Sequence, residues 1–160
     1  LASNAQTCAP SLPLCALPLP PAQGGAVDAG IDARLNGYGL LGLHEGDAHV
    51  SRNAGGVVTP DELRSLAISQ RLLGTTEIIL IHHTDCGMLT FTDDDFKRSI
   101  QEDTGLKPGW AAESFFDVEE DVRQSLRRIE ASQFVTKHES LRGFVFDVAT
   151  GRLSEVKLDG

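Results

Sequence analysis

The segment Glu77–His83 (EIILIHH) constrains the fold most, because it is short, almost wholly apolar and rich in β-branched residues. A run of this kind is typical of a strand buried on both faces, as in a parallel sheet covered by helices. A helix is predicted directly before it, since Thr59 can cap the first turn, Pro60 suits the first helical position and Gly74 can end the helix.

Further elements can be assigned on either side of this unit. Residues 26–31 are a weak strand candidate, because Asp28 and Gly30 interrupt the apolar pattern, and residues 47–51 suit a short strand. The strand–helix–strand order predicts an α/β fold with a mostly parallel central sheet flanked by helices. Downstream, the pattern predicts a helix after Thr92, a helix with Val118, Val122, Leu126 and Ile129 on one face, a strand over 142–148 and a return strand over 153–156.

Residues 1–25 differ from the rest of the chain, because they hold five of the seven prolines and no charged side chain. Proline fixes φ and lacks an amide donor, so this segment is predicted to be an extended N-terminal arm. Two interpretations of the arm stay open: a disordered tail, or an arm that lies on the surface of its own chain or of a partner. Residues 26–160 are predicted to form a single α/β domain.

The composition excludes several classes of partner. The 160 residues include 23 acidic and 14 basic side chains, and the net charge of -9 argues against binding to nucleic acid or to anionic membranes. No apolar run is long enough to span a bilayer. Three cysteines are an odd number, which does not favour a disulfide framework, and no basic leader precedes the first apolar stretch. We therefore expect a cytoplasmic protein with reduced thiols.

Three polar segments, residues 32–34, 51–56 and 83–87, follow the predicted strands. Sites in open α/β sheets form at such carboxyl ends. His83 and Cys86 have H-x-x-C spacing, and an imidazole and a thiolate three residues apart in a turn can reach one zinc ion. The same spacing also fits a strand-end histidine and a buried cysteine with structural roles, so both interpretations stay open.

The other polar segments are less specific. Asp32 and Arg34 either form a carboxylate–guanidinium pair or lie apart in solvent. The glycines of residues 52–56 allow close backbone approach but do not form a dinucleotide-binding fingerprint. His82 should point to the opposite face from His83 and make a structural hydrogen bond. The remaining histidines are interpreted as structural or exposed: His44, His49 and His138.

Together these segments resemble a short β-class carbonic anhydrase over about residues 31–160, in IDARL, SRNAGG, RSLAISQRLLGTTEIILIHHTDCGM and HESLRGFVFDVATGRL. The resemblance implies a homodimer that can pair further into a tetramer, and the reversible hydration of carbon dioxide to bicarbonate. It also implies a Zn²⁺ ion held by His83, Cys86 and a first-strand cysteine, with a catalytic pair at Asp32 and Arg34. The amide of Gly87 is then expected to contact the substrate or another anion.

The family's C-x-D-x-R motif reads G-I-D-A-R here, so Gly30 stands where the first-strand zinc cysteine is expected, and neither cysteine of residues 1–25 takes its place. Three interpretations stay open. Asp32 becomes the third zinc ligand, and its pairing with Arg34 breaks or is shared. Alternatively, zinc is weak or absent, and the chain is a catalytically silent homologue that binds bicarbonate or another small anion. In the third, residues 1–30 differ from the natural protein, as an out-of-frame reading of GC-rich DNA would. A hydrolase for a carbon dioxide analogue such as carbon disulfide is a further alternative within the same broad family.

Overall fold

The computed structural model describes residues 17–136 and 138–158, which contain one five-stranded sheet. The sheet has the order β2-β1-β3-β4-β5, in which the first four strands run parallel and β5 is antiparallel to β4. The strands are β1 (Gly25–Gly30), β2 (Ala48–Asn53), β3 (Glu77–His83), β4 (Ser140–Phe146) and β5 (Leu153–Val156). The predicted α/β fold with a mostly parallel sheet is confirmed.

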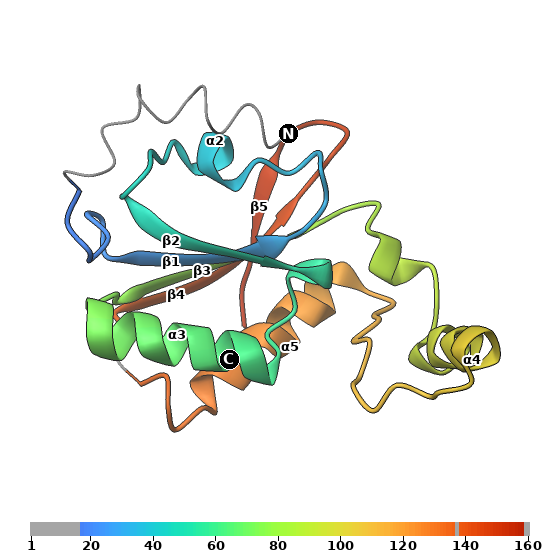
Figure 1. Ribbon diagram of the computed structural model, residues 1–160. Coiled ribbons are helices and arrows are strands. Elements are labelled where there is room, and N and C mark those ends of the chain that lie inside the picture. The colour runs from blue at the N-terminus through green and yellow to red at the C-terminus, as the bar shows by residue number, and fades with distance from the viewer. Residues whose placement is uncertain (1–16, 137, 159–160) are drawn as a thin grey trace, which may run out of the picture.

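Helices cover both faces of this sheet. Figure 1 shows α3 and α5 on one face and the short α2 on the other. Thr59 caps α3 and Thr92 caps α4, as predicted, each by accepting a hydrogen bond from a backbone amide of the first turn. The helical elements are α2 (Gly37–Leu41), α3 (Pro60–Leu73), α4 (Asp93–Thr104) and α5 (Val118–Glu130), with 3₁₀ turns η3 (Ala54–Gly56) and η4 (Gly87–Leu89).

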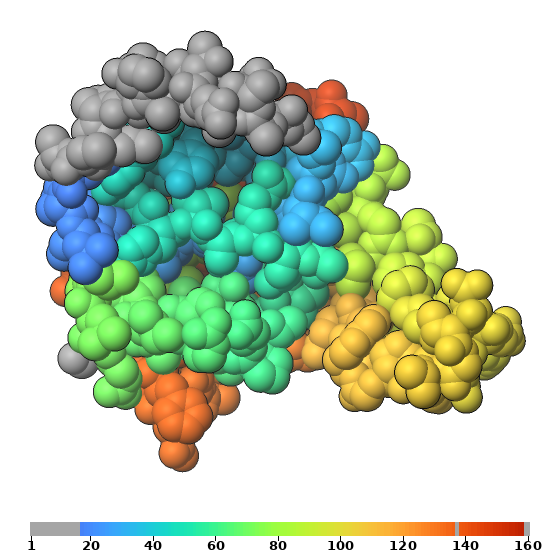
Figure 2. All heavy atoms as spheres, viewed as in Figure 1, coloured from blue at the N-terminus to red at the C-terminus, as the bar shows by residue number. Residues whose placement is uncertain are grey.

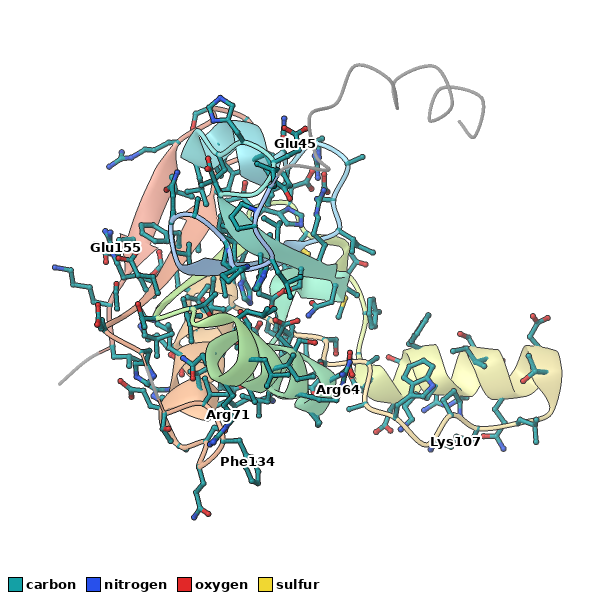
Figure 3. The ribbon with its side chains drawn as sticks, turned by 60° about the vertical axis from the view of Figure 1, so that its left-hand side comes forward. Glu45, Arg64, Arg71, Lys107, Phe134 and Glu155 are labelled. Carbon is teal, nitrogen blue, oxygen red and sulfur yellow. The ribbon has the colours of Figure 1, made fainter. Side chains whose placement is uncertain are left out.

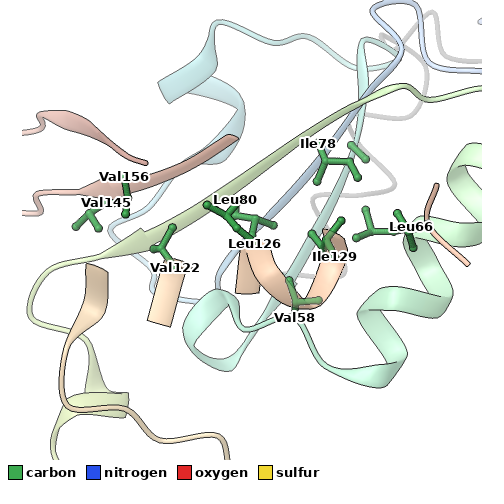
Figure 4. Close-up of a cluster of buried hydrophobic side chains, with 11 residues drawn as sticks. Val58, Leu66, Ile78, Leu80, Val122, Leu126, Ile129, Val145 and Val156 are labelled. Carbon is green, nitrogen blue, oxygen red and sulfur yellow. The ribbon is translucent and has the colours of Figure 1, made fainter. Parts of the chain in front are cut away.

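The main core lies between the sheet and the helices α3 and α5. Figure 4 shows Ile78 and Leu80 of β3 facing Val122, Leu126 and other apolar side chains of these helices. A second cluster fills the opposite face, where Ile81 of β3 packs with residues of β1 and of the α2 region. Because neighbouring residues of β3 are buried on both faces, the interpretation of EIILIHH as a central strand is confirmed.

The first strand is a regular central strand, although the sequence indicates it only weakly. β1 pairs with β2 on one side and with β3 on the other, and Asp28 within it is fully buried. The hydroxyl of Ser51 lies 3.4 Å from Oδ1 of Asp28 and 2.8 Å from Oε1 of Glu62. Burial, together with the nearby Glu62, raises the pKa of Asp28 to about 9. The strand therefore forms with Asp28 as a protonated acid, and the expectation that Asp28 and Gly30 interrupt it is wrong.

Helix α4 projects from the rest of the molecule, as Figures 2 and 3 show. None of its residues is buried. The segment that follows α4 is held against it, because the carboxylate of Asp93 accepts hydrogen bonds from the amides of Ala112 and Ser114 at 2.8 and 2.9 Å. The ring of Phe96 also packs near that of Trp110, at 6.3 Å between centroids.

Part of the proline-rich arm contacts the body of the protein. The amides of Ala22 and Gln23 donate to the carbonyl oxygens of Gly46 and Asp47 at 2.8 and 2.9 Å. Residues 1–16, including Cys8 and Cys15, lie outside the described residues, so the extended arm over 1–25 stays a prediction. Across the described ranges, no helix combines the length and the apolar character needed to cross a membrane.

Candidate active site

The segments that follow β1 and β3 meet at the carboxyl end of the sheet, beside η3. A cavity of about 300 Å³ opens there. Its walls include apolar side chains as well as the predicted site residues, and its lining includes Ile31, Asp32, His83, Cys86, Gly87 and Phe91. The structure thus brings Asp32, His83, Cys86 and Gly87 together, as the sequence predicts.

His83, the last residue of β3, is held in one orientation. Its Nδ1 donates to the carbonyl oxygen of Thr84 at 2.8 Å, because a carbonyl can only accept. This tautomer leaves a lone pair on Nε2, which lies 3.9 Å from Oδ2 of Asp32. A hydrogen bond with Cys86 raises the pKa of His83, and burial opposes that rise. An imidazole oriented by a hydrogen bond from one ring nitrogen to a backbone carbonyl is typical of metal-binding histidines.

Cys86 lies directly before η4, and its thiol is free and buried. Its side chain belongs to a small apolar cluster with Val57, Met88 and Phe115. The carbonyl of Cys86 also accepts a hydrogen bond from the amide of Leu89 at 3.1 Å, which fixes the turn. The sulfur is therefore held near His83 by packing on one side and by the turn on the other.

Asp32 and Arg34 form a close ion pair. Nε of Arg34 donates to Oδ1 of Asp32 at 2.9 Å, and Nη2 donates to Oδ2 at 2.8 Å. The backbone amide of Arg34 adds a third hydrogen bond to Oδ1 at 2.8 Å. These hydrogen bonds hold the pKa of Asp32 well below its usual range. The two side chains are paired rather than separately solvated.

Asp85 was missed by sequence reasoning, although it lies between His83 and Cys86. Nη1 of Arg34 donates to Oδ2 of Asp85 at 2.8 Å, and Nη2 donates to the backbone carbonyl of Asp85 at 3.1 Å. Asp85 has a φ of 53°, which is uncommon for a residue with a side chain and more frequent for Asp than for most others. Its place in the H-x-x-C turn was the available signal, but only the fold shows that it reaches Arg34.

Arg52 and the glycines of residues 52–56 shape the backbone behind the cavity. Nε and Nη2 of Arg52 donate to the carbonyl of Gly30 at 2.9 and 2.7 Å, and Nη2 also reaches the carbonyl of Asp32 at 2.6 Å. Gly56 has a φ of 75°, and a Cβ there would lie 3.1 Å from the backbone nitrogen of Gly30. The close approach expected of these glycines is therefore present, whereas the role of Arg52 was not foreseen.

Comparison with known proteins places this geometry in a family. The family described as carbonic anhydrase matches residues 29–114. The chain is also 71% identical, over 140 residues, to β-carbonic anhydrase 1 of Mycobacterium tuberculosis, covering 88% of this chain and 86% of that protein. The chain belongs to the β-class carbonic anhydrases. The solved carbonic anhydrase of Glaciozyma antarctica superposes with a TM-score of 0.88 at 39% identity, covering 98% of this chain and 95% of that one.

The match to the Mycobacterium tuberculosis carbonic anhydrase also reaches further than the resemblance did. Residues 31–160 number only 130, so a match that covers 88% of the 160 residues includes at least about ten residues before Ile31. The family likeness therefore does not end near Ile31. A carbon disulfide hydrolase of Acidithiobacillus thiooxidans is 31% identical over 148 residues, covering 79% of this chain and 74% of that protein.

The donor atoms of this carbonic anhydrase fit zinc only in part. His83 and Cys86 supply an imidazole nitrogen and a sulfur, the ligand types that zinc prefers, and Thr84 orients the imidazole. Among the residues that the structure describes, however, no three side chains of the ligating types converge on one point. The nearest third donor, Asp32, has both its oxygens bound to Arg34.

Proposed function

We propose that this carbonic anhydrase catalyses the reversible hydration of carbon dioxide with a zinc ion held by His83 and Cys86. The main support is the orientation of His83, whose Nε2 is left without the proton and shares a cavity with Cys86 and Asp32. Zinc bound there would supply an acidified water molecule as the nucleophile. Family membership supports the reaction, and the donor chemistry supports the metal.

The catalytic pair has a separate task in this proposal. Arg34 keeps Asp32 ionised and holds its carboxylate at the edge of the cavity. An ionised and immobile Asp32 can accept a hydrogen bond from a reacting oxygen and so orient it. Gly87 lines the same cavity and leaves space for a small substrate, and Ile31 and Phe91 give the uncharged carbon dioxide an apolar wall.

We propose further that this site binds zinc less tightly than a site with three protein ligands would. Gly30 offers no donor atom, and each donor lost from a chelating set weakens metal retention. Asp32 is the nearest replacement, since its Oδ2 lies 3.9 Å from Nε2 of His83. It could act as a ligand only by giving up part of its pairing with Arg34, so metal binding and dyad formation compete for one carboxylate.

The proposal is tested by zinc content and by stopped-flow carbon dioxide hydration of the zinc-supplemented protein. Wild type should bind one zinc per chain and turn over, and Cys86→Ala should lose both properties while keeping its circular dichroism spectrum. A Cys86→Ala variant that retains zinc at the wild-type stoichiometry would contradict the assignment. Carbon disulfide should be assayed as a second substrate, because proteins named carbon disulfide hydrolases match this chain in sequence and in fold.

A second candidate function is a catalytically silent protein that binds bicarbonate or another small anion. The observation in its favour is that, over residues 17–136 and 138–158, no three metal-ligating side chains converge. Isothermal titration with bicarbonate after chelation separates the two functions. Heat of binding without zinc, together with absent turnover in excess zinc, would favour the silent homologue.

We propose further that the protein is a homodimer that can pair into a tetramer, as the resemblance implies, and that it acts in the cytoplasm with reduced thiols, as its three cysteines suggest. Light scattering of the purified protein tests the assembly. A mass equal to one chain at micromolar concentration would contradict it.

A further inference from the structure

We propose that Asp85 is a positioning residue, which holds Arg34 in the arrangement where it binds both oxygens of Asp32. The inference rests on the proposed function only in assigning Asp32 a part in the reaction. Asp85 itself lines no wall of the cavity and acts through Arg34.

The guanidinium of Arg34 is bound by two carboxylates, one on each side of its planar group. One edge of the guanidinium, Nε and Nη2, meets the carboxylate of Asp32, and Nη1 meets the carboxylate of Asp85 at 2.8 Å. Nη2 reaches the backbone carbonyl of Asp85 as well, at 3.1 Å. A guanidinium bound by Asp32 alone could pivot about that edge, whereas one that is also bound at Nη1 is fixed in its plane.

The backbone at Asp85 explains how this second anchor is made. Its φ of 53° lies in the left-handed region, which turns its carbonyl and its side chain toward Arg34. A left-handed residue with a Cβ is strained, and such strain is found where the surrounding structure requires the conformation. Because Asp85 is between His83 and Cys86, it connects the turn that carries the proposed zinc ligands to the Asp32–Arg34 pair.

The ion pair between Arg34 and Asp85 is expected to contribute little to the stability of the fold. The side chain of Asp85 is 77% exposed and that of Arg34 is 48% exposed. Ion pairs this open to water contribute little to folding, because solvent screens them. Their effect is therefore expected in the position of Arg34, and through it in the position of Asp32, rather than in the melting temperature.

Arg34 and the proposed zinc ion compete for the carboxylate of Asp32, so loss of Asp85 should change zinc affinity and turnover in a defined direction. While Asp85 and Asp32 together fix Arg34, the Asp32 carboxylate stays on the guanidinium. Loss of the Asp85 carboxylate loosens Arg34 and frees Asp32 for a larger share of the time. Zinc affinity should then rise while turnover falls, since a carboxylate engaged by the metal no longer orients the reacting oxygen.

The test compares Asp85→Asn and Asp85→Gly with the control Asp103→Asn. Asparagine removes the charge but keeps an oxygen that can accept from Nη1, so it should act as a partial rescue. Glycine removes the side chain and is at ease at positive φ, so it leaves the backbone carbonyl in place. Asp103 is an exposed residue of α4, the helix that projects from the body, and its substitution makes the same change of charge elsewhere.

Two readouts separate the positioning role from the function. The first is the hydrogen exchange of the Arg34 Nε–H group in metal-free protein, followed by NMR. It should accelerate by about two- to fivefold in Asp85→Gly, less in Asp85→Asn and not in Asp103→Asn. The second readout is the pair of zinc affinity and kcat. In Asp85→Gly, zinc affinity should rise and kcat should fall, each by about two- to fivefold, while the melting temperature stays unchanged.

The outcomes are distinguishable. If exchange accelerates but the wild type neither binds zinc nor hydrates carbon dioxide, the positioning of Arg34 by Asp85 stands and the proposed function fails. If the wild type is an active zinc enzyme and Asp85→Gly matches it in exchange, zinc affinity and kcat, the inference is overturned.

Discussion

Gly30 lies directly beside His83. A Cβ atom on residue 30 would be 3.1 Å from Cδ2 and 3.4 Å from Nε2 of the imidazole. Any side chain introduced at residue 30 would therefore meet Nε2 of His83. Gly30 is not among the glycines with positive φ, so the backbone there accepts a residue with a side chain. The missing donor is thus a matter of side-chain chemistry at one position, since the strand that carries it is in place.

Gly30→Cys is predicted to restore zinc binding strength. The new thiol would enter the space beside His83 and Cys86 after a shift of a few tenths of an ångström in the imidazole. Zinc affinity should rise by at least about tenfold, because a chelating thiolate is added to the set. Gly30→Ser is the matched control, since it adds nearly the same bulk without a thiolate. Competition with a chromophoric chelator measures both, and equal zinc affinities would contradict this account of position 30.

Asp28→Asn is predicted to raise stability more at alkaline than at acidic pH. The folded-state pKa of Asp28 is about 9 and its ordinary value is 3.8, so the folded protein binds this proton more tightly than the unfolded chain. The associated stabilisation is complete below the ordinary value and is lost as pH rises to about 9. The advantage of Asp28→Asn over wild type should therefore grow between about pH 5 and pH 9, by an amount on the order of a few kcal/mol.

Urea unfolding at several pH values measures this difference, with Asp103→Asn as the control for the change of charge. Asp103 is exposed on α4, and its substitution makes the same change of charge away from the core. A constant difference between Asp28→Asn and wild type over the same range would show that Asp28 is not held protonated by the fold.

Arg52→Met is predicted to destabilise the protein and to loosen the active site. Arg52 donates three hydrogen bonds to the carbonyls of Gly30 and Asp32, and a methionine fills similar space without any donor. Loss of partners for these carbonyls should lower the free energy of unfolding by about 1–3 kcal/mol. Arg64→Met is the control, because Arg64 makes an exposed pair with Asp61 and should cost less than about 1 kcal/mol. Thermal unfolding compares the two, and equal losses would contradict the role given to Arg52.

Gly143→Ala is predicted to disturb the core that α5 forms on the sheet. A Cβ at Gly143 would collide with Val122 and lie 3.0 Å from Cδ1 of Leu126. Overpacking of this kind lowers the free energy of unfolding by about 1–3 kcal/mol. Gly109→Ala is the control, since a Cβ there meets nothing within 4 Å. Chemical denaturation that ranks the two variants equally would show that α5 yields to the added methyl group.

Much of the fold could be predicted from local signals. The β-branched run of Glu77–His83 predicts β3 with its observed ends, and the Thr59–Pro60 pair predicts the start of α3. Strand ends without such markers were predicted less accurately, since the strand expected over 142–148 lies at Ser140–Phe146. β1 was predicted only weakly, because a charged residue such as Asp28 interrupts the apolar pattern expected of a central strand. In the structure, Asp28 is a protonated acid that accepts a hydrogen bond from Ser51, which is compatible with a central strand.

The active site was predictable where its residues are neighbours in sequence. His83 and Cys86 share a turn, Asp32 and Arg34 share another, and His82 makes the expected buried hydrogen bond, to Asp121 at 2.8 Å. Contacts between distant segments could not be foreseen from spacing. The Arg34–Asp85 bond joins residues 51 positions apart, so it depends on the parallel register that brings the ends of β1 and β3 together.

Zinc binding by His83 and Cys86 can be seen directly in an anomalous-scattering map of crystals grown with excess zinc. We expect one peak per chain, about 2.0–2.3 Å from Nε2 of His83 and from the sulfur of Cys86. Bare side chains at both positions in saturating zinc would contradict it.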